Sequence, residues 1–197
     1  MRLVLDWDGT ATEVDGLHML VEEFGDQAVF EHMEGVLGNG LTLHEVIAAE
    51  IATLTLPLDV AVGWIREHVT LRPGFAELVE RMAPTILSSG FHELIEPVLD
   101  REGVEVEVRA NRLDVRGDGW RPVWRDETVC AICGESCKRG SLEHEPYIFV
   151  GDGYSDRCAA LAAERVFARD GLARYFAEQQ VPFERFETLH DVAAALS

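Results

Sequence analysis

Residues 3–10 of the chain read LVLDWDGT, a short apolar run that ends in two carboxylates separated by one residue. The run has the length and composition of a buried strand, and open α/β sheets bind their ligands at the carboxyl ends of strands. Because side chains alternate along a strand, we expect Asp6 and Asp8 to point to one side and Trp7 to the other. Two carboxylates this close repel each other, so either one is protonated or a cation lies between them. An acidic junction between a strand and a turn is the alternative.

Three further apolar runs of strand length occur, each followed by a stretch with helical periodicity. They are PTILSSG, YIFVGDG and RVFARD, which begin at Pro84, Tyr147 and Arg165. Strands that alternate with helices pair in parallel through right-handed crossovers. The sequence therefore predicts an α/β fold with a doubly wound parallel sheet and a Rossmann-like core.

A long helical segment, residues 12–72, interrupts this alternation, and it exceeds an ordinary connection in length. Its periodicity and its Gly and Pro breaks predict helices at residues 15–25, 27–37, 41–54 and 57–69. We expect this segment, called the cap below, to be an inserted four-helix domain. The core domain would then consist of residues 1–11 and 73–197.

A second insertion is predicted at residues 104–126, where apolar and polar residues alternate on both sides of Asp118 and Gly119. An Asp-Gly pair between two alternating runs is a hairpin signal. We therefore expect a β-hairpin attached to the core.

The formal net charge of −19 at pH 7 repels phosphate backbones and anionic membrane surfaces. We therefore expect neither nucleic acid nor a membrane as a partner. The apolar run at the amino terminus is too short for a secretion signal or a membrane-spanning helix, which predicts a cytoplasmic protein. The sequence makes no prediction about the oligomeric state.

Polar residues also end two of the other predicted strands. Asp152 and Asp156 follow YIFV, so strands lying side by side would bring Asp6, Asp8 and Asp152 around one hard cation such as Mg²⁺. Ser88 and Ser89 precede a predicted helix, where hydroxyls and backbone N–H groups together suit an anion.

One basic residue differs from all the others. Of the seventeen Lys and Arg residues, sixteen are Arg, and the single Lys is Lys138 in CAICGESCKRG, residues 130–140. An ammonium is a compact point charge that a planar guanidinium does not replace. We expect Lys138 to balance the charge of phosphate oxygens at the strand ends.

Four segments resemble, in order, the four motifs of the haloacid dehalogenase superfamily of phosphatases. They are DWDGT, LSSG, CKRG and VGDGYSD, which begin at Asp6, Leu87, Cys137 and Val150. The helical cap and ANRLDV at residues 110–115 are similar to the phosphoserine phosphatase branch. CGESCK and VFARDGL are similar to the phosphatases of methionine salvage that act on 2-hydroxy-3-keto-5-methylthiopentenyl-1-phosphate.

The resemblance implies a Mg²⁺-dependent hydrolase of small phosphorylated metabolites. Asp6 would attack phosphorus to form an aspartyl-phosphate, and Asp8 would protonate the leaving oxygen and then activate water. The implied metal ligands are Asp6, Asp152 and the backbone carbonyl of Asp8, with Asp156 orienting Lys138 or the metal's waters. The implied phosphate contacts are Ser88, its neighbour Ser89 with a nearby amide, and Lys138.

The cap departs from the phosphoserine phosphatase pattern. Asp15 stands where that branch has a Glu, Glu50 stands where its carboxylate-binding Arg is expected, and Arg66 is the only Arg or Lys between residues 12 and 71. We expect Asp15 and Glu50 to contact a neutral or hydroxylated phosphomonoester. A phosphoserine phosphatase, a phosphotransferase of the same fold, and a non-catalytic metal-binding interaction module are the alternatives.

Three of the four cysteines, Cys130, Cys133 and Cys137, lie within eight residues. Their spacing offers three soft ligands, with His144 or water as the fourth ligand of a zinc ion. Reduced structural thiols and redox control are the alternatives. Cys158 lies in a predicted helix and is expected to be a small buried core residue.

Overall fold

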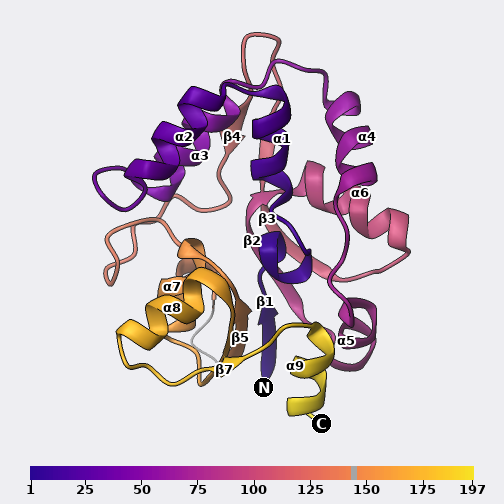
Figure 1. The fold of residues 1–197 in the computed structure, drawn as a ribbon, viewed down its shortest axis with the longest axis vertical. Coiled ribbons are helices and arrows are strands. Elements are labelled where there is room, and N and C mark those ends of the chain that lie inside the picture. The colour runs from indigo at the N-terminus through magenta and orange to yellow at the C-terminus, as the bar shows by residue number, and fades with distance from the viewer. Residues whose placement is uncertain (143–145) are drawn as a thin grey trace.

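The computed structural model describes residues 1–142 and 146–197, within which the strands form one sheet with helices on both sides (Figure 1). The strand order is β4-β3-β2-β1-β5-β6-β7, and every neighbouring pair is parallel except β3 and β4. The strands are β1 (Arg2–Leu5), β2 (Thr85–Phe91), β3 (Glu107–Asp114), β4 (Arg121–Val123), β5 (Tyr147–Gly151), β6 (Arg165–Ala168) and β7 (Glu184–Arg185). The α/β fold class predicted from the sequence is confirmed.

Alternate residues of the central strands supply two separate hydrophobic clusters, one on each face of the sheet. In β1, Leu3 and Leu5 belong to the larger cluster and Val4 to the smaller one. The larger cluster includes α5 (Phe75–Met82), α6 (His92–Glu102) and α9 (Leu189–Ala195), and the smaller includes α7 (Arg157–Ala160) and α8 (Asp170–Glu178). Burial on both faces explains why these strands read as continuous apolar runs.

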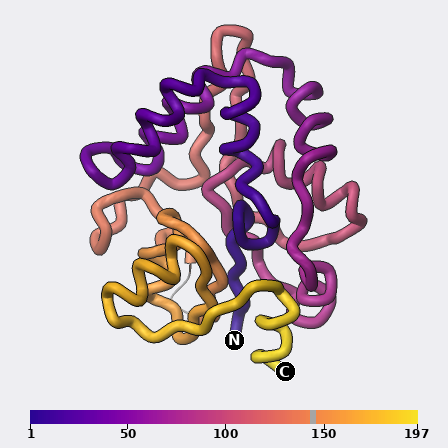
Figure 2. The backbone as a smooth tube through the Cα atoms, viewed as in Figure 1, coloured from indigo at the N-terminus to yellow at the C-terminus, as the bar shows by residue number. Residues whose placement is uncertain are grey.

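The cap segment contains helices α1 (Gly16–Phe24), α2 (Gln27–Val36), α3 (Leu43–Ile51) and α4 (Leu58–His68). They lie beyond one end of the sheet, whereas the two chain termini lie at the opposite end (Figures 1 and 2). Asp15, Asp26 and Thr42 cap the first three helices through side-chain oxygens. Thr12 pairs with Leu71, so the two ends of the cap segment lie side by side.

The predicted hairpin is present, but its first arm has two partners. The beginning of β3 pairs in parallel with β2, and only residues Arg112, Leu113 and Asp114 pair antiparallel with β4. The turn carries Trp120, which is buried against the cap and donates hydrogen bonds to the carbonyls of Leu54 and Leu56 at 3.1 Å. The hairpin therefore connects the core to the cap through these hydrogen bonds.

No helix in the described part of the chain combines the length and the apolar character needed to cross a membrane.

Arg72, the last residue of the cap segment, is buried and bonded to the backbone of the loop that follows β1. Its side chain donates to the carbonyls of Thr10 at 2.8 Å, Gly9 at 2.7 Å and Thr12 at 2.9 Å. It also donates to the carbonyl of Glu187 at 3.2 Å. A buried guanidinium that fills several carbonyl acceptors at once fixes the loop between the sheet and the cap.

We predict that Arg72→Met lowers the free energy of unfolding by about 3 kcal/mol or more, because several buried carbonyls lose their donor. Urea denaturation measures this change. Arg81→Met is the matched control, since Arg81 makes an exposed ion pair with Glu77 at 3.1 Å and should change stability by about 0.5 kcal/mol or less. Equal effects of the two substitutions would contradict this role of Arg72.

Candidate active site

Strands β1, β2 and β5 are neighbours, and their carboxyl ends carry the polar residues singled out in the sequence. A cavity of about 320 Å³ lies between these strand ends and the cap. Residues of the core and of the cap line it together, namely Asp6, Asp8, Ser88, Ser89, Gly90, Asp152 to Ser155, and Asp15, Leu17, His18, Glu34, Leu37, Leu43, Val46, Ile47 and Glu50. The structure therefore brings three of the four motif segments to one cavity.

The backbone leaves the sheet earlier than expected after β1. The strand ends at Leu5, and residues Trp7–Ala11 form a tight turn with φ of +72° at Gly9. The turn, and not strand alternation, places Asp6 and Asp8 on the cavity while Trp7 packs edge-on against Phe75 in the core. A side chain at position 9 would lie 2.5 Å from Asp152, so glycine is required by both conformation and space.

Lys138 is fully buried beside the cavity and pairs with two carboxylates. Its ammonium donates to Asp6 and, at 2.6 Å, to Asp156. Asp156 also accepts from the backbone N–H groups of Asp152 at 2.9 Å and Gly153 at 3.1 Å. Burial alone would lower the pKa of Lys138, but Asp156 and Asp6 raise it, so Lys138 stays charged.

Asp6 and Asp152 have raised pKa values. The pKa of Asp6 lies well above its ordinary value, because burial and the charges of Asp156 and Asp152 raise it more than the charge of Lys138 lowers it. Burial and the charge of Asp156 raise the pKa of Asp152 to about 6. Carboxylates confined together in this way favour a bound cation.

The side chain of Asp8 reaches from the turn after β1 to the beginning of α1, where its carboxylate accepts from the N–H of Gly16 at 2.9 Å. Burial and the nearby charge of Asp15 raise the pKa of Asp8 to about 8. An acid with this pKa carries a proton at neutral pH and is able to donate it to a leaving group.

The donor set fits a magnesium ion. Asp6, Asp152 and Asp156 each offer a carboxylate oxygen, and these atoms lie within 4.8 Å of one another. Thr10 donates to Asp152 at 2.8 Å, which orients one of these carboxylates. Mg²⁺ prefers such hard oxygen ligands and commonly uses only one or two carboxylates from the protein.

The end of β2 is held by the hairpin segment. Ser88 lines the cavity with an oxygen that accepts from the N–H of Gly90 at 2.9 Å. Arg125 donates to the carbonyl of Ser88 at 3.0 Å, and Asn111 donates to the carbonyl of Ser89 at 2.8 Å. These bonds fix the strand end at which both serines face the cavity.

The cap side of the cavity is acidic, with one histidine. Asp15 caps α1 and lies 3.5 Å from the ring of His18, whose other nitrogen lies 3.7 Å from Glu34. Burial alone would lower the pKa of His18, but Asp15, Glu34 and Glu50 raise it. Arg66, by contrast, is exposed on α4 and is absent from the cavity lining.

Several residues of the site carried no sequence signal of their own. His18 and Glu34 lie on different cap helices and meet only through helix packing, so their spacing does not reveal them. Thr10, in the loop after β1, donates to Asp152, and Arg72 donates to the backbone of the same loop. A lone Arg at the end of the cap segment is the only available hint in the sequence. Cys158 is buried in α7, as predicted, yet its sulfur joins those of the other cysteines. His144 lies outside the described residues.

The chain resembles known proteins over nearly its whole length. It matches the model of the haloacid dehalogenase-like hydrolase family over residues 3–161. It is 26% identical to a 2-hydroxy-3-keto-5-methylthiopentenyl-1-phosphate phosphatase of Bacillus mycoides (strain KBAB4), covering 100% of this chain and 95% of that protein. It is 25% identical to a polyol phosphate phosphatase of Saccharomyces cerevisiae, covering 97% of this chain and 90% of that protein.

Solved structures show the same fold. A substrate-bound phosphoserine phosphatase superposes with a TM-score of 0.73 at 16% identity, covering 98% of this chain and 97% of that one. The family and the fold class predicted from the motifs are thus confirmed. The chain belongs to the haloacid dehalogenase-like hydrolases and is a phosphatase.

Proposed function

We propose that the chain is a Mg²⁺-dependent phosphomonoester hydrolase that works through an aspartyl-phosphate on Asp6. The observation that supports this most is the buried contact between Lys138 and Asp6 at the end of β1, beside Asp8 and Ser88 on one cavity. A nucleophile, an acid, a hydroxyl and a fixed cation at one strand edge are the groups that phosphoryl transfer uses.

The residues that would hold Mg²⁺ are Asp6, Asp152 and the backbone carbonyl of Asp8, with Asp156 in support. When bound, the ion supplies positive charge that screens the approach of the Asp6 carboxylate to a phosphate dianion. Lys138 offsets part of the same charge, and Asp156 keeps its ammonium in place.

In the first step, an oxygen of Asp6 forms a bond to phosphorus while the bond from phosphorus to the leaving oxygen breaks. Asp8 donates its proton to that leaving oxygen. In the second step, Asp8 accepts a proton from a water whose oxygen bonds to phosphorus, while the bond from phosphorus to Asp6 breaks and releases inorganic phosphate. Ser88 and Ser89, with a neighbouring backbone N–H, would hold the phosphoryl oxygens during both steps. The cap would exclude bulk water from the cavity.

We predict that Asp6→Asn lowers release of inorganic phosphate from p-nitrophenyl phosphate by about 10³-fold or more, since an amide does not replace the nucleophile. The assay contains Mg²⁺, and EDTA should stop the reaction of the unmodified protein. Asp118→Asn, in the exposed turn of the hairpin, is the control and should keep full activity. A fully active Asp6→Asn protein would rule out the covalent mechanism.

The substrate class follows from the cap, and we propose a neutral, hydroxylated phosphomonoester. Glu50 is 1% exposed, lines the cavity, and both its carboxylate oxygens lack a hydrogen-bond partner among the described residues. Two buried acceptors without donors match ligand hydroxyls. No Arg or Lys is among the residues that line the cavity in the described part of the chain, which disfavours a substrate carboxylate such as that of phosphoserine.

We predict that Glu50→Ala lowers kcat/KM for hydroxylated substrates, with glycerol 3-phosphate and a hexitol phosphate as probes, by about tenfold. p-Nitrophenyl phosphate is the matched control because it has no hydroxyl for Glu50 to bind, and its kcat/KM should change by about twofold or less. Phosphoserine should be the poorer substrate of the unmodified protein. Preference for phosphoserine over both probes would overturn the assignment.

The same glutamate predicts a pH effect on stability. Burial raises the pKa of Glu50 to about 7. The charge of His18 lowers this pKa, and the charge of Glu34 raises it further. The folded state therefore holds a proton that the unfolded state releases near pH 4.5, so stability is lost as pH rises towards and through about 7. The free energy of unfolding of the Glu50→Gln protein should equal that of the unmodified protein at pH 4.5 and exceed it by about 1–3 kcal/mol at pH 8. Urea titrations at both pH values measure this; an equal difference at both would contradict it.

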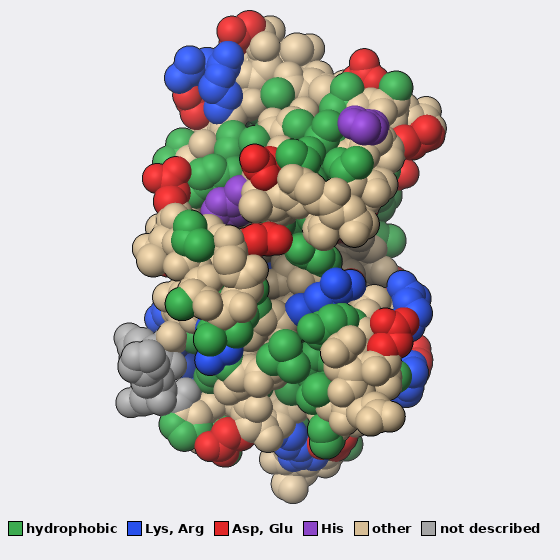
Figure 3. Space-filling view, turned by 90° about the vertical axis from the view of Figure 1, so that its left-hand side faces the viewer, with side chains coloured by type: hydrophobic (Ala, Val, Ile, Leu, Met, Phe, Trp, Pro, Cys, Tyr) green, Lys and Arg blue, Asp and Glu red, His purple; other side chains and the backbone are tan. Residues whose placement is uncertain are grey.

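The remaining expectations stay predictions. They are a cytoplasmic location, water as the acceptor in place of another phosphate acceptor, and no nucleic-acid partner. Figure 3 shows the face on the side of α2, α3, α7 and α8, where basic side chains lie in small separate groups among acidic and hydrophobic ones. That distribution gives a phosphate backbone no continuous basic track on this face.

A further inference from the structure

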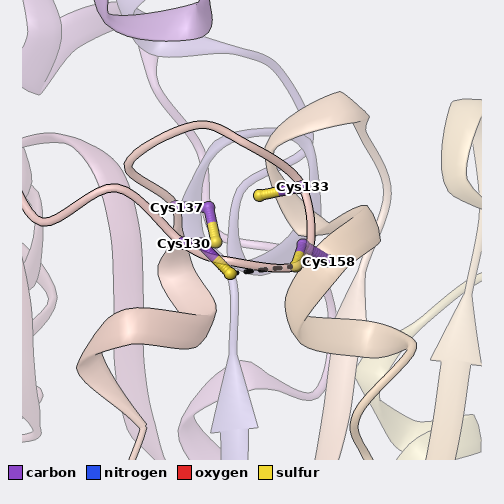
Figure 4. Close-up of side chains that lie close together, drawn as sticks. All are labelled: Cys130, Cys133, Cys137 and Cys158. Atoms are coloured by element: carbon purple, nitrogen blue, oxygen red, sulfur yellow. Dashed lines mark hydrogen bonds between the residues drawn. The ribbon is translucent and has the colours of Figure 1, made fainter.

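The four cysteine sulfurs converge from two separate segments. Cys130, Cys133 and Cys137 lie on the loop that leads to Lys138, and Cys158 lies on α7 (Figure 4). All four sulfur atoms are within 4.8 Å of one another, and those of Cys130 and Cys158 are 3.9 Å apart. The three-cysteine pattern of the loop therefore gains a fourth thiol from the core.

The loop that carries three of the cysteines folds into a compact turn. In Cys130–Gly134 the N–H of Gly134 donates to the carbonyl of Cys130 at 2.9 Å, and Gly134 has φ of +78°. A second backbone bond, from the N–H of Cys130 to the carbonyl of Glu135 at 2.9 Å, closes this turn and keeps its cysteines close together.

The sulfur spacing matches one tetrahedral ion. Zinc–sulfur bonds of about 2.3 Å at tetrahedral angles put neighbouring sulfurs about 3.8 Å apart. The 3.9 Å separation of Cys130 and Cys158 agrees with that value, and the limit of 4.8 Å for the whole set requires little movement of the other sulfurs. A multi-iron cluster needs room between its ligands that this arrangement does not offer.

We propose that Cys130, Cys133, Cys137 and Cys158 bind a single structural zinc ion that joins the loop to α7. Four thiolates in a closed tetrahedral set are typical of structural zinc, whereas Mg²⁺ avoids sulfur. The site is separate from the oxygen ligands of the cavity, and it does not depend on the reaction that the enzyme performs.

The position of this ion gives it a consequence for the active site. Cys137 directly precedes Lys138, and Cys158 lies two residues after Asp156, so the ion ties together the two backbone segments that carry the buried ion pair. The same loop reaches the cap, because Glu135 accepts from the N–H of Leu43 at 3.2 Å. Glu135 also accepts from the hydroxyl of Tyr154, outside the cap, at 2.9 Å. Zinc binding therefore positions Lys138 without touching the substrate.

The test is metal binding by the full chain, measured without any activity assay. Elemental analysis of the purified protein should find about one zinc per chain, retained on dialysis. After chelation under reducing conditions, titration with Co²⁺ should produce a sulfur-to-metal charge-transfer band and the intense visible absorption of a tetrahedral four-thiolate site. A protein that holds no zinc and shows no such Co²⁺ spectrum would overturn the proposal.

The ligand set is tested by substitutions. Cys158→Ser should lose zinc on dialysis and weaken and shift the Co²⁺ absorption, whereas Ala160→Ser in the same helix places a similar buried hydroxyl nearby and should keep both. His144→Ala should also keep them. Loss of zinc in His144→Ala together with its retention in Cys158→Ser would show that the fourth ligand is not Cys158 and would overturn the four-thiolate site.

The effect on Lys138 rests on the proposed function and is measured separately. Cys158→Ser should lower kcat for p-nitrophenyl phosphate by about tenfold with little change in KM, because the substrate still enters the cavity while the cation is misplaced. Cys158→His, which keeps a zinc ligand, should restore zinc content and part of kcat. Unchanged kcat in a zinc-free protein would refute the positioning role and leave the metal measurement to decide the site.

Discussion

A single buried ammonium is the constraint around which this enzyme is built. Lys138 is 2% exposed, and water does not reach its charge, so Asp6 and Asp156 must solvate it instead. Removing charges from water is costly, and it is tolerated only when every charge has partners of good geometry. The parallel order β2-β1-β5 provides that geometry, since it places the strand ends next to one another.

The partners of Lys138 explain why Arg does not replace it in a chain that otherwise uses Arg. A guanidinium presents a planar fork of donors, whereas the ammonium fits between the oxygens of Asp6 and Asp156 as a compact charge. The second oxygen of Asp156 is already committed to the N–H groups of Asp152 and Gly153. Little room is therefore left for a wider cation.

The core of the fold and the strand-end residues were predictable because they depend on local pattern. Buried parallel strands read as apolar runs, and the ends of such strands are where Asp6, Asp8, Ser88 and Asp152 fall in the sequence. Their presence around one cavity agrees with that expectation, although the early end of β1 was not foreseen. Strand alternation alone does not describe a loop that turns directly after Leu5.

The contacts that were not predictable all depend on tertiary packing. His18 and Glu34 belong to different helices of the cap, and Cys158 joins the cysteine loop from α7. Short-range spacing carries no record of which helix faces which. The three loop cysteines were visible as a group because they lie close together in the sequence. Cys158 lies far from them in the sequence and was predicted only to be a small buried side chain.

The pairing of Thr12 with Leu71 has a consequence for how such enzymes diversify. A segment whose two ends meet can be lengthened, shortened or exchanged without displacing the strands on either side of it. In the proposed mechanism, the groups that would break the phosphate ester lie outside the cap segment, and the cap supplies those that would face the rest of the substrate. Selection on substrate choice could then act on the cap segment alone, without altering the proposed catalytic residues.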